Sequence, residues 1–340
     1  MAAKLKTNKK QNSISNESIL LTGGTGSFGA EFVNTLLKSK SFGGIIRVFS
    51  RDEYKQHLLQ KKFKDDPRLR FFIGDVRDRD RLIRAMNNVD IVVHAAALKQ
   101  VPALEYNPFE AVKTNILGTQ NVIDAVLDTD VKKAILISSD KAVNPVNLYG
   151  ATKLVAEKLF IQSNSYVGAK PTSFSVVRYG NVAGSRGSVI PYFYEQAKKN
   201  MLTITDERMT RFWITLPEGV RFVLDSLTRM RGGEIFVPKI PSVKIIELAR
   251  VIAPKAKLKI TGVRPGEKIH EILIGIDEAR HTKDMGNYFV IEPEFHWWTE
   301  NNNKGGEMLE DLFSYSSENN PVWLSSEKLK EILYKLMIES

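Results

Sequence analysis

A glycine-rich stretch between a short apolar segment and a helical one restricts this chain to few folds. Residues 19–22, Ile-Leu-Leu-Thr, predict a buried strand, and glycines follow at Gly23, Gly26 and Gly29. Residues 30–37 then carry apolar side chains at helical spacing. Glycines at such a junction permit a tight turn and let a helix N-terminus approach a phosphate without a Cβ in the way. We therefore predict a dinucleotide-binding turn, although the spacing is GxxGxxG rather than GxGxxG.

The rest of the chain extends this beginning into an α/β fold with a doubly wound parallel sheet of the Rossmann type. Strand patterns alternate with helical ones up to about residue 180, as parallel sheets require. We predict a disordered basic tail over residues 1–17, a dinucleotide-binding domain over 18–180, and a smaller substrate-binding lobe over 181–340, from which some segments return to the first domain. The elements expected in this lobe are helices over 191–200, 217–230 and 327–337 (the last capped by Ser325 or Ser326), a short strand over 202–205, and a loop-rich region over 276–320.

Composition excludes several classes of protein. The net charge is +10, but four lysines of the N-terminal tail contribute to it and the other basic residues are dispersed, so we expect no nucleic-acid binding. The absence of cysteine excludes disulfides and thiolate catalysis, and the five histidines lack metal-ligand spacing, so we expect no metal site. No apolar run approaches the ~20 residues that span a bilayer. We expect a cytoplasmic protein without a membrane segment.

The second predicted strand, residues 45–49, indicates which dinucleotide binds. It ends in Ser50, Arg51 and Asp52, and a hydroxyl and a guanidinium suit a ribose 2′-phosphate, whereas an NAD site usually offers a carboxylate first. We favour NADP over NAD; the alternative is that Arg51 only pairs with Asp52 or Glu53. The candidate cofactor contacts are Gly23, Thr25, Gly26, Ser27, Phe28, Gly29, Ser50, Arg51, Asp52, Lys55, Asp75, Val76, Ala95, Ala96, Lys99, Asn115, Tyr149 and Lys153.

Two acid–base pairs lie within one short stretch. Tyr149 and Lys153 are four residues apart, so a helix places them on one face, where an ammonium can lower the pKa of a phenol. Asp140 and Lys141 follow an apolar strand pattern and offer a second acid and a second base. One pair is enough for a dehydrogenase. The second pair suggests that the oxidised substrate undergoes a further reaction.

These motifs resemble the extended short-chain dehydrogenase/reductase superfamily, and within it the inverting UDP-N-acetylglucosamine 4,6-dehydratases that open the pseudaminic acid pathway. The resemblance runs from about residue 17 to the end. The stretches that carry it are Thr22–Gly29, Ser50–Glu53, Gly74–Asp78, His94–Lys99, Asp140–Lys153, Arg178–Ser188, Met209–Trp213, Arg264–Lys268, Tyr315–Ser317 and Trp323–Ser325. It implies a homo-oligomer, either a dimer or a hexamer, with a UDP-sugar as substrate.

The resemblance also implies roles for individual residues. Tyr149, aided by Lys153, would remove the proton of the sugar 4-hydroxyl, Lys141 would remove the C5 proton, and Asp140 would protonate the departing 6-hydroxyl. We expect Lys141 to lose its charge near neutral pH because its site is closed and lies next to cations. The implied substrate contacts are Lys99, Lys141, Asn181, Val182, Arg186, Thr203, Arg211, Arg264 and Glu267.

Three other functions remain open on these residues. A UDP-sugar 4-epimerase would use Tyr149 and Lys153 but would leave Asp140 and Lys141 without a task. A retaining 4,6-dehydratase typically presents Asp-Glu where this chain has Asp140 and Lys141. A non-catalytic NADP-binding regulator commonly lacks the Tyr-x-x-x-Lys pair that is intact here.

Overall fold

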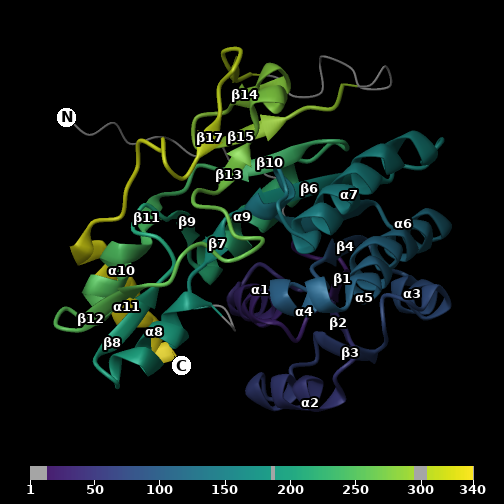
Figure 1. The fold of residues 1–340 in the computed structure, drawn as a ribbon. Helices are drawn as coiled ribbons and strands as arrows, with labels where there is room; N and C mark the ends of the chain where they lie inside the picture. Colours follow the sequence, from purple (N-terminus) through teal and green to yellow (C-terminus); the bar gives the residue numbers. More distant parts are fainter. Residues whose placement is uncertain (1–13, 185–187, 295–304, 340) are drawn as a thin grey trace, which may run out of the picture.

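A computed structural model describes residues 14–184, 188–294 and 305–339, and its centre is a ten-stranded sheet (Figure 1). Seven neighbouring strands are parallel, and three at one edge are antiparallel. In spatial order they are β16 (Glu307–Met308), β14 (Thr282–Asp284), β15 (Tyr288–Ile291), β10 (Ile235–Pro238), β6 (Ser173–Tyr179), β5 (Lys133–Ser139), β4 (Ile91–His94), β1 (Ile19–Thr22), β2 (Ile46–Ser50) and β3 (Leu69–Ile73). The strand order reverses between β1 and β4, where doubly wound sheets bind their ligands. The predicted α/β fold class is confirmed.

Helices cover the sheet in two groups. α1 (Ser27–Lys38) packs against α9 (Leu216–Arg229), while α3 (Arg79–Met86), α6 (Gly118–Asp128) and α7 (Leu148–Gln162) pack in a row. The shorter connecting helices are α2 (Glu53–Lys62), α4 (Val101–Tyr106), α5 (Pro108–Ala111), the π-helix η1 (Val112–Leu117) and the 3₁₀ segments η2 (Asp140–Ala142) and η3 (Ser163–Tyr166).

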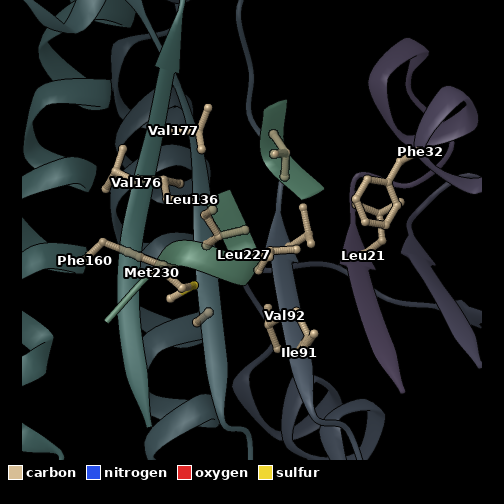
Figure 2. Packing of buried hydrophobic residues seen from close by; sticks show 14 of the residues in the cluster. Leu21, Phe32, Ile91, Val92, Leu136, Phe160, Val176, Val177, Leu227 and Met230 are labelled. Atoms are coloured by element: carbon tan, nitrogen blue, oxygen red, sulfur yellow. The ribbon is translucent and has the colours of Figure 1, made fainter. Parts of the chain in front are cut away.

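The main hydrophobic core joins the strands to these helices. Strand residues such as Leu21, Leu136 and Val176 are fully buried, as expected for parallel strands that have both faces covered. Figure 2 shows Phe160 of α7 and Leu227 of α9 packed against the same strands. This packing fixes the ends of β1, β4 and β5, from which the site is built.

The C-terminal lobe has its own hydrophobic cluster. Phe193, Leu202, Leu248 and Leu329 are among its buried members. The helices of the lobe are α8 (Val189–Ala197), α10 (Ile245–Ile252) and α11 (Ser326–Glu339). Its short strands are β7 (Asn181–Val182), β8 (Met201–Ile204), β9 (Thr210–Ile214), β11 (Ser242–Lys244) and β12 (Lys257–Ile260). β13 (Ile272–Ile274) pairs with β17 (Tyr315–Ser316), both contribute to the main core, and η4 (Ile276–His281) follows β13.

Most elements expected in the second half of the chain are present within two residues of their predicted bounds. Ser325 is the residue that caps α11, because its hydroxyl accepts from the Lys328 backbone N–H at 3.3 Å. Within the region over 276–320, which was predicted to be loop-rich, the short strands β14, β15 and β16 extend the main sheet. Residues 1–13 of the predicted tail lie outside the described residues. Within the described ranges, no helix combines the length and the apolarity needed to cross a bilayer.

Candidate active site

A cavity of about 640 Å³ opens at the carboxyl ends of the parallel strands. Its walls come from the turns after β1, β3 and β4 and from the last residues of β2, β5 and β6. α7 contributes Tyr149 and Lys153, and the lobe contributes residues such as Trp213. This place, next to the reversal of strand order, is where an α/β sheet of this kind binds its ligands.

The glycine turn fits a diphosphate. Gly23 has a φ of +68°, and a Cβ there would lie 2.9 Å from the Ala96 backbone. Gly26 is the N-cap of α1 and supplies no side-chain cap, and the first turn of the helix carries no acidic residue. The start of α1 therefore lines the cavity without an anionic side chain in its first turn, which suits a phosphate.

The end of β2 brings a guanidinium and a carboxylate to the cavity. Asp52 caps α2, because its carboxylate accepts from the Lys55 backbone N–H at 2.9 Å, and it also pairs with the Lys55 ammonium at 2.6 Å. The alternative interpretation was that Arg51 pairs with Asp52 or Glu53. Its guanidinium instead lies 3.6 Å from Asp75. Arg51 and Ser50 both line the cavity. The Asp52 carboxylate, the nearest one after β2, is thus already bonded to the first turn of α2.

Nearly all predicted cofactor contacts line this one cavity. They are Gly23, Thr25, Gly26, Ser27, Phe28, Gly29, Ser50, Arg51, Asp52, Lys55, Asp75, Val76, Ala95, Ala96, Lys99, Tyr149 and Lys153. Asn115 does not line it. Its buried amide bonds the backbone N–H and C=O of Leu98 at 2.8 Å and the Thr152 hydroxyl at 3.0 Å. Asn115 therefore holds the segment next to Lys99 in place.

Tyr149 and Lys153 line the cavity together, but their electrostatics differ from the prediction. Burial lowers the pKa of Lys153 to about 8, and its Nζ donates to the Ile137 carbonyl at 2.6 Å. Burial raises the pKa of Tyr149, while Lys141 and a hydrogen bond with Ser139 oppose the rise. The expectation that Lys153 lowers the Tyr149 pKa is therefore wrong for this structure, where Lys141 is the cation that acts on the phenol.

Asp140 and Lys141 begin η2, directly after β5. Asp140 is fully buried behind the cavity wall, and its Oδ1 accepts from Ser139 Oγ at 2.7 Å and from Lys141 Nζ at 3.0 Å. Its Oδ2 has no hydrogen-bond partner among the described residues. Burial raises the pKa of Asp140, although Lys141 opposes the effect. A carboxyl group that tends to keep its proton is suited to act as an acid.

Lys141 keeps its charge more firmly than predicted. Burial opposes the ammonium, but the carboxylates of Asp140 and Glu271 outweigh both burial and nearby Arg211, and they raise the pKa of Lys141. Glu271 Oε1 lies 3.2 Å from Lys141 Nζ. The expected loss of charge near neutral pH is therefore wrong for the protein on its own, because two carboxylates flank this amine. Lys99, on the same cavity, has its pKa lowered by burial and by Lys141.

The predicted substrate contacts divide into two groups. Lys99, Lys141, Asn181 and Val182 line the cavity. Thr203, Arg211, Arg264 and Glu267 do not, and Arg186 lies outside the described residues. The guanidinium of Arg211 donates to the carbonyls of Thr210, Lys268 and Ile269 at 2.7–3.0 Å, so it does not fit the expected contact with a diphosphate. Thr203 faces Gln196, whose amide donates to its hydroxyl at 2.8 Å.

Two residues of the site were missed in the sequence. Ser139 lines the cavity and bonds Asp140 and Tyr149, and its place at the end of β5 next to Asp140 was the available signal. Glu271 stands three residues after Lys268, and nothing in its sequence context places it beside Lys141. Among the described residues, no cluster of three or more potential metal ligands is present.

Comparison with known proteins extends these observations. Residues 19–293 match the model of the family described as Polysaccharide biosynthesis protein. The chain is 52% identical to a Campylobacter jejuni protein named UDP-N-acetylglucosamine 4,6-dehydratase (inverting), over 93% of this chain and 97% of that one. It is 41% identical to a Rickettsia bellii protein named UDP-glucose 4-epimerase, over 94% and 96% of the two chains.

Solved structures agree with the fold. An X-ray structure of Pen from Bacillus thuringiensis superposes with a TM-score of 0.86 at 38% identity, covering 96% of this chain and 99% of that one. DesIV, a dTDP-glucose 4,6-dehydratase from Streptomyces venezuelae solved with NAD and TYD, shares the fold with a TM-score of 0.65 at 22% identity, over 74% and 86% of the two chains. This chain therefore belongs to the Polysaccharide biosynthesis protein family of extended short-chain dehydrogenases/reductases, and it is an enzyme of the carbon–oxygen lyase branch represented by the Campylobacter jejuni relative.

Proposed function

We propose that this enzyme catalyses the inverting 4,6-dehydration of UDP-N-acetylglucosamine to UDP-2-acetamido-2,6-dideoxy-β-L-arabino-hex-4-ulose, the first step of pseudaminic acid biosynthesis, with NADP as bound cofactor. The observation that carries the proposal is that Lys141 lines the same cavity as Tyr149 and Lys153 while Asp140 lies directly behind it. An epimerase needs only Tyr149 and Lys153. The name of the Campylobacter jejuni relative supports the same choice.

The cavity residues divide the work of such a reaction. A nicotinamide cofactor held by the lining residues of this cavity would supply the hydride chemistry. Tyr149 is placed to accept the proton of the sugar 4-hydroxyl, and Ser139 and the positive charge of Lys141 stabilise the phenolate that does so. Once C4 is a ketone, the C5 proton becomes acidic, and Lys141 is the base that we assign to it. Lys141 must first lose the proton that its carboxylate neighbours stabilise.

Asp140 supplies the proton that lets the 6-hydroxyl leave as water. Because Asp140 is buried behind Ser139, we infer that its proton reaches the cavity through the Ser139 hydroxyl. In the protonated state Asp140 donates to Ser139, and Ser139 donates to the departing hydroxyl. The raised pKa of Asp140 supports this acid role.

Product analysis tests the proposal. We expect mass spectrometry of UDP-N-acetylglucosamine incubated with the enzyme to show the loss of one water molecule. The Lys141→Ala variant should reduce this turnover by about 10²–10⁴-fold, the usual contribution of general acid–base catalysis. A product of unchanged mass would indicate a 4-epimerase, and near-normal turnover of Lys141→Ala would contradict the role of the lysine.

The cofactor can be identified without any substrate. Heat denaturation should release the bound dinucleotide, and we expect mass spectrometry to identify it as NADP because Ser50 and Arg51 face the cavity while Asp52 caps α2. Release of NAD alone would contradict the assignment.

We also propose a homo-oligomer, a dimer or a hexamer. The large side chains of Tyr106, Phe109 and Leu117 are exposed on the consecutive helices from α4 to η1, which is typical of an interaction surface. Size-exclusion chromatography with light scattering tests this, and a monomer at all concentrations would contradict it.

A further inference from the structure

Glu271 is a buried carboxylate that the proposed mechanism does not use. It immediately precedes β13, and only 2% of its surface is exposed. Its Oε2 has no hydrogen-bond partner in the described part of the chain. A charged group that is this deeply buried costs stability unless cations compensate it, so its surroundings indicate what it does.

Three cations from different elements surround Glu271. Lys141 Nζ of η2 lies 3.2 Å from Oε1, Arg211 Nε of β9 lies 3.7 Å from the same oxygen, and Lys268 Nζ lies 3.9 Å from Oε2. Arg211 is bound to three backbone carbonyls, and Lys268 donates to the Val143 carbonyl at 2.5 Å. Of the three cations, Lys141 alone lines the cavity. The contact between Glu271 and Lys141 is therefore the one that reaches the reacting groups.

The C-terminal segment fixes the backbone of Glu271. Ser317 N–H donates to the Glu271 carbonyl at 2.8 Å, and Ser317 Oγ accepts from the Glu271 N–H at 2.9 Å. β17, which contains Tyr315 and Ser316, pairs with β13 beside it. The Tyr-Ser-Ser motif of the tail thus holds Glu271 at a fixed place relative to η2.

We propose that Glu271 is a positioning residue that holds the Lys141 ammonium at the wall of the cavity and stabilises its charge. Glu271 does not line the cavity, so it acts through Lys141. Asp140, Glu271 and Arg211 are the charged groups that act on Lys141. Burial lowers the pKa of Lys99 and of Lys268, and Lys141 in turn contributes to both shifts.

The two carboxylates beside Lys141 have different tasks under this proposal. Burial raises the pKa of Asp140, which suits the acid. Burial also opposes the charge of Glu271, but Lys141, Arg211 and Lys268 outweigh it and lower the pKa of Glu271. When Asp140 is protonated, Glu271 is consequently the carboxylate that still compensates Lys141. Asp140 can thus be a protonated acid while Glu271 remains an anion, both beside Lys141.

The Glu271→Gln variant tests the proposal, because glutamine keeps the size and an acceptor oxygen but removes the charge. We expect the Lys141 titration, followed by NMR of ¹³Cε-labelled lysines and assigned with Lys141→Ala, to move to lower pH by about one to three units, the usual effect of an opposite charge at this distance. The matched control is Glu318→Gln, which removes an exposed carboxylate beside His270 on the same tail and should leave the titration unchanged. An unchanged Lys141 midpoint in Glu271→Gln would overturn the proposal.

A second variant separates charge from position. Glu271→Asp keeps the charge but moves it away by one methylene, so the midpoint should fall by less than in Glu271→Gln while kcat drops and KM changes little. It also replaces Glu271→Gln if that variant does not fold. The predicted fall in kcat rests on the proposed function, whereas the titration of Lys141 needs no substrate. Failure of the proposed function is therefore distinguishable from failure of the role assigned to Glu271. A rise in KM alone, with midpoint and kcat unchanged, would indicate a merely structural residue and overturn the proposal.

Discussion

At the residue scale, Lys141 and Lys153 show how burial and neighbours compete. Both amines line one cavity, yet the pKa of Lys141 is raised by two carboxylates and that of Lys153 is lowered to about 8 by burial. Residue type and spacing predicted that both amines would belong to one site. They did not predict the direction of the Lys141 shift, because Glu271 reaches Lys141 only through the packing of the lobe.

His94 provides a pH-dependent prediction at the same scale. It is buried between the Thr22 and Thr119 hydroxyls, at 2.7 and 3.1 Å, and burial lowers its pKa to about 3 from 6.5. Between these values the unfolded chain binds the extra proton, so stability falls as the pH falls. Because of His94, we expect the free energy of unfolding to be about 2 kcal/mol lower at pH 5 than at pH 7.

Urea unfolding at both pH values measures this cost. His94→Gln removes the titrating ring, so its stability should fall less than that of the wild type between the two pH values. An identical decrease in both proteins would show that His94 is not responsible.

At the element scale, the contact between α7 and η2 brings the two acid–base pairs together. Gly150 of α7 lies against η2, and a Cβ at this position would overlap the carbonyl oxygen of Lys141. Asn147 caps α7 by accepting from the Gly150 N–H at 2.8 Å and also donates to the Gly266 carbonyl at 2.7 Å. Glycine is therefore required at 150 by a close approach of two elements.

We expect Gly150→Ala to lower kcat by about ten-fold or more, because a misplacement of ~1 Å between catalytic groups is costly. Gly219→Ala is the matched control: Gly219 lies in α9, where a Cβ would meet only Ile214 at 3.9 Å. Alanine there should preserve kcat and raise stability by up to about 1 kcal/mol. Steady-state kinetics and urea unfolding of both variants measure these effects. Equal kcat in the two would contradict the close-approach argument.

The sequence predicted helices and strands best where the apolar residues follow a single periodicity. The strand, glycine turn and helix from Ile19 to Lys38 follow the pattern, as do the candidate residues at strand ends such as Ser50 and Asp140. β14 and β15 were missed because they are short and lie in a polar region. Arg211 and Glu267 were predicted to contact substrate but do not line the cavity, since the packing of the lobe determines their contacts.

At the scale of the whole molecule, the lobe depends on the end of the chain. Leu329 and Leu333 of α11 are buried in the lobe cluster. We expect Leu329→Ala to cost about 2–5 kcal/mol of unfolding free energy, as large-to-small changes in a core do. Tyr334→Ala, on the same helix at an exposed position, should change it by about 0.5 kcal/mol or less. Urea unfolding distinguishes them, and equal effects would show that α11 does not stabilise the lobe.

The configuration of the product at C5 distinguishes an inverting dehydratase from a retaining one. Proton NMR of the enzyme with UDP-N-acetylglucosamine in D₂O, without added cofactor, follows the new methyl group, the isotope at C5 and the ring couplings in one experiment. We predict a C6 methyl signal, deuterium at C5 and the couplings of the L-arabino sugar. A methyl product with D-xylo couplings would contradict inversion and the role of Lys141, and UDP-N-acetylgalactosamine without a methyl signal would contradict dehydration.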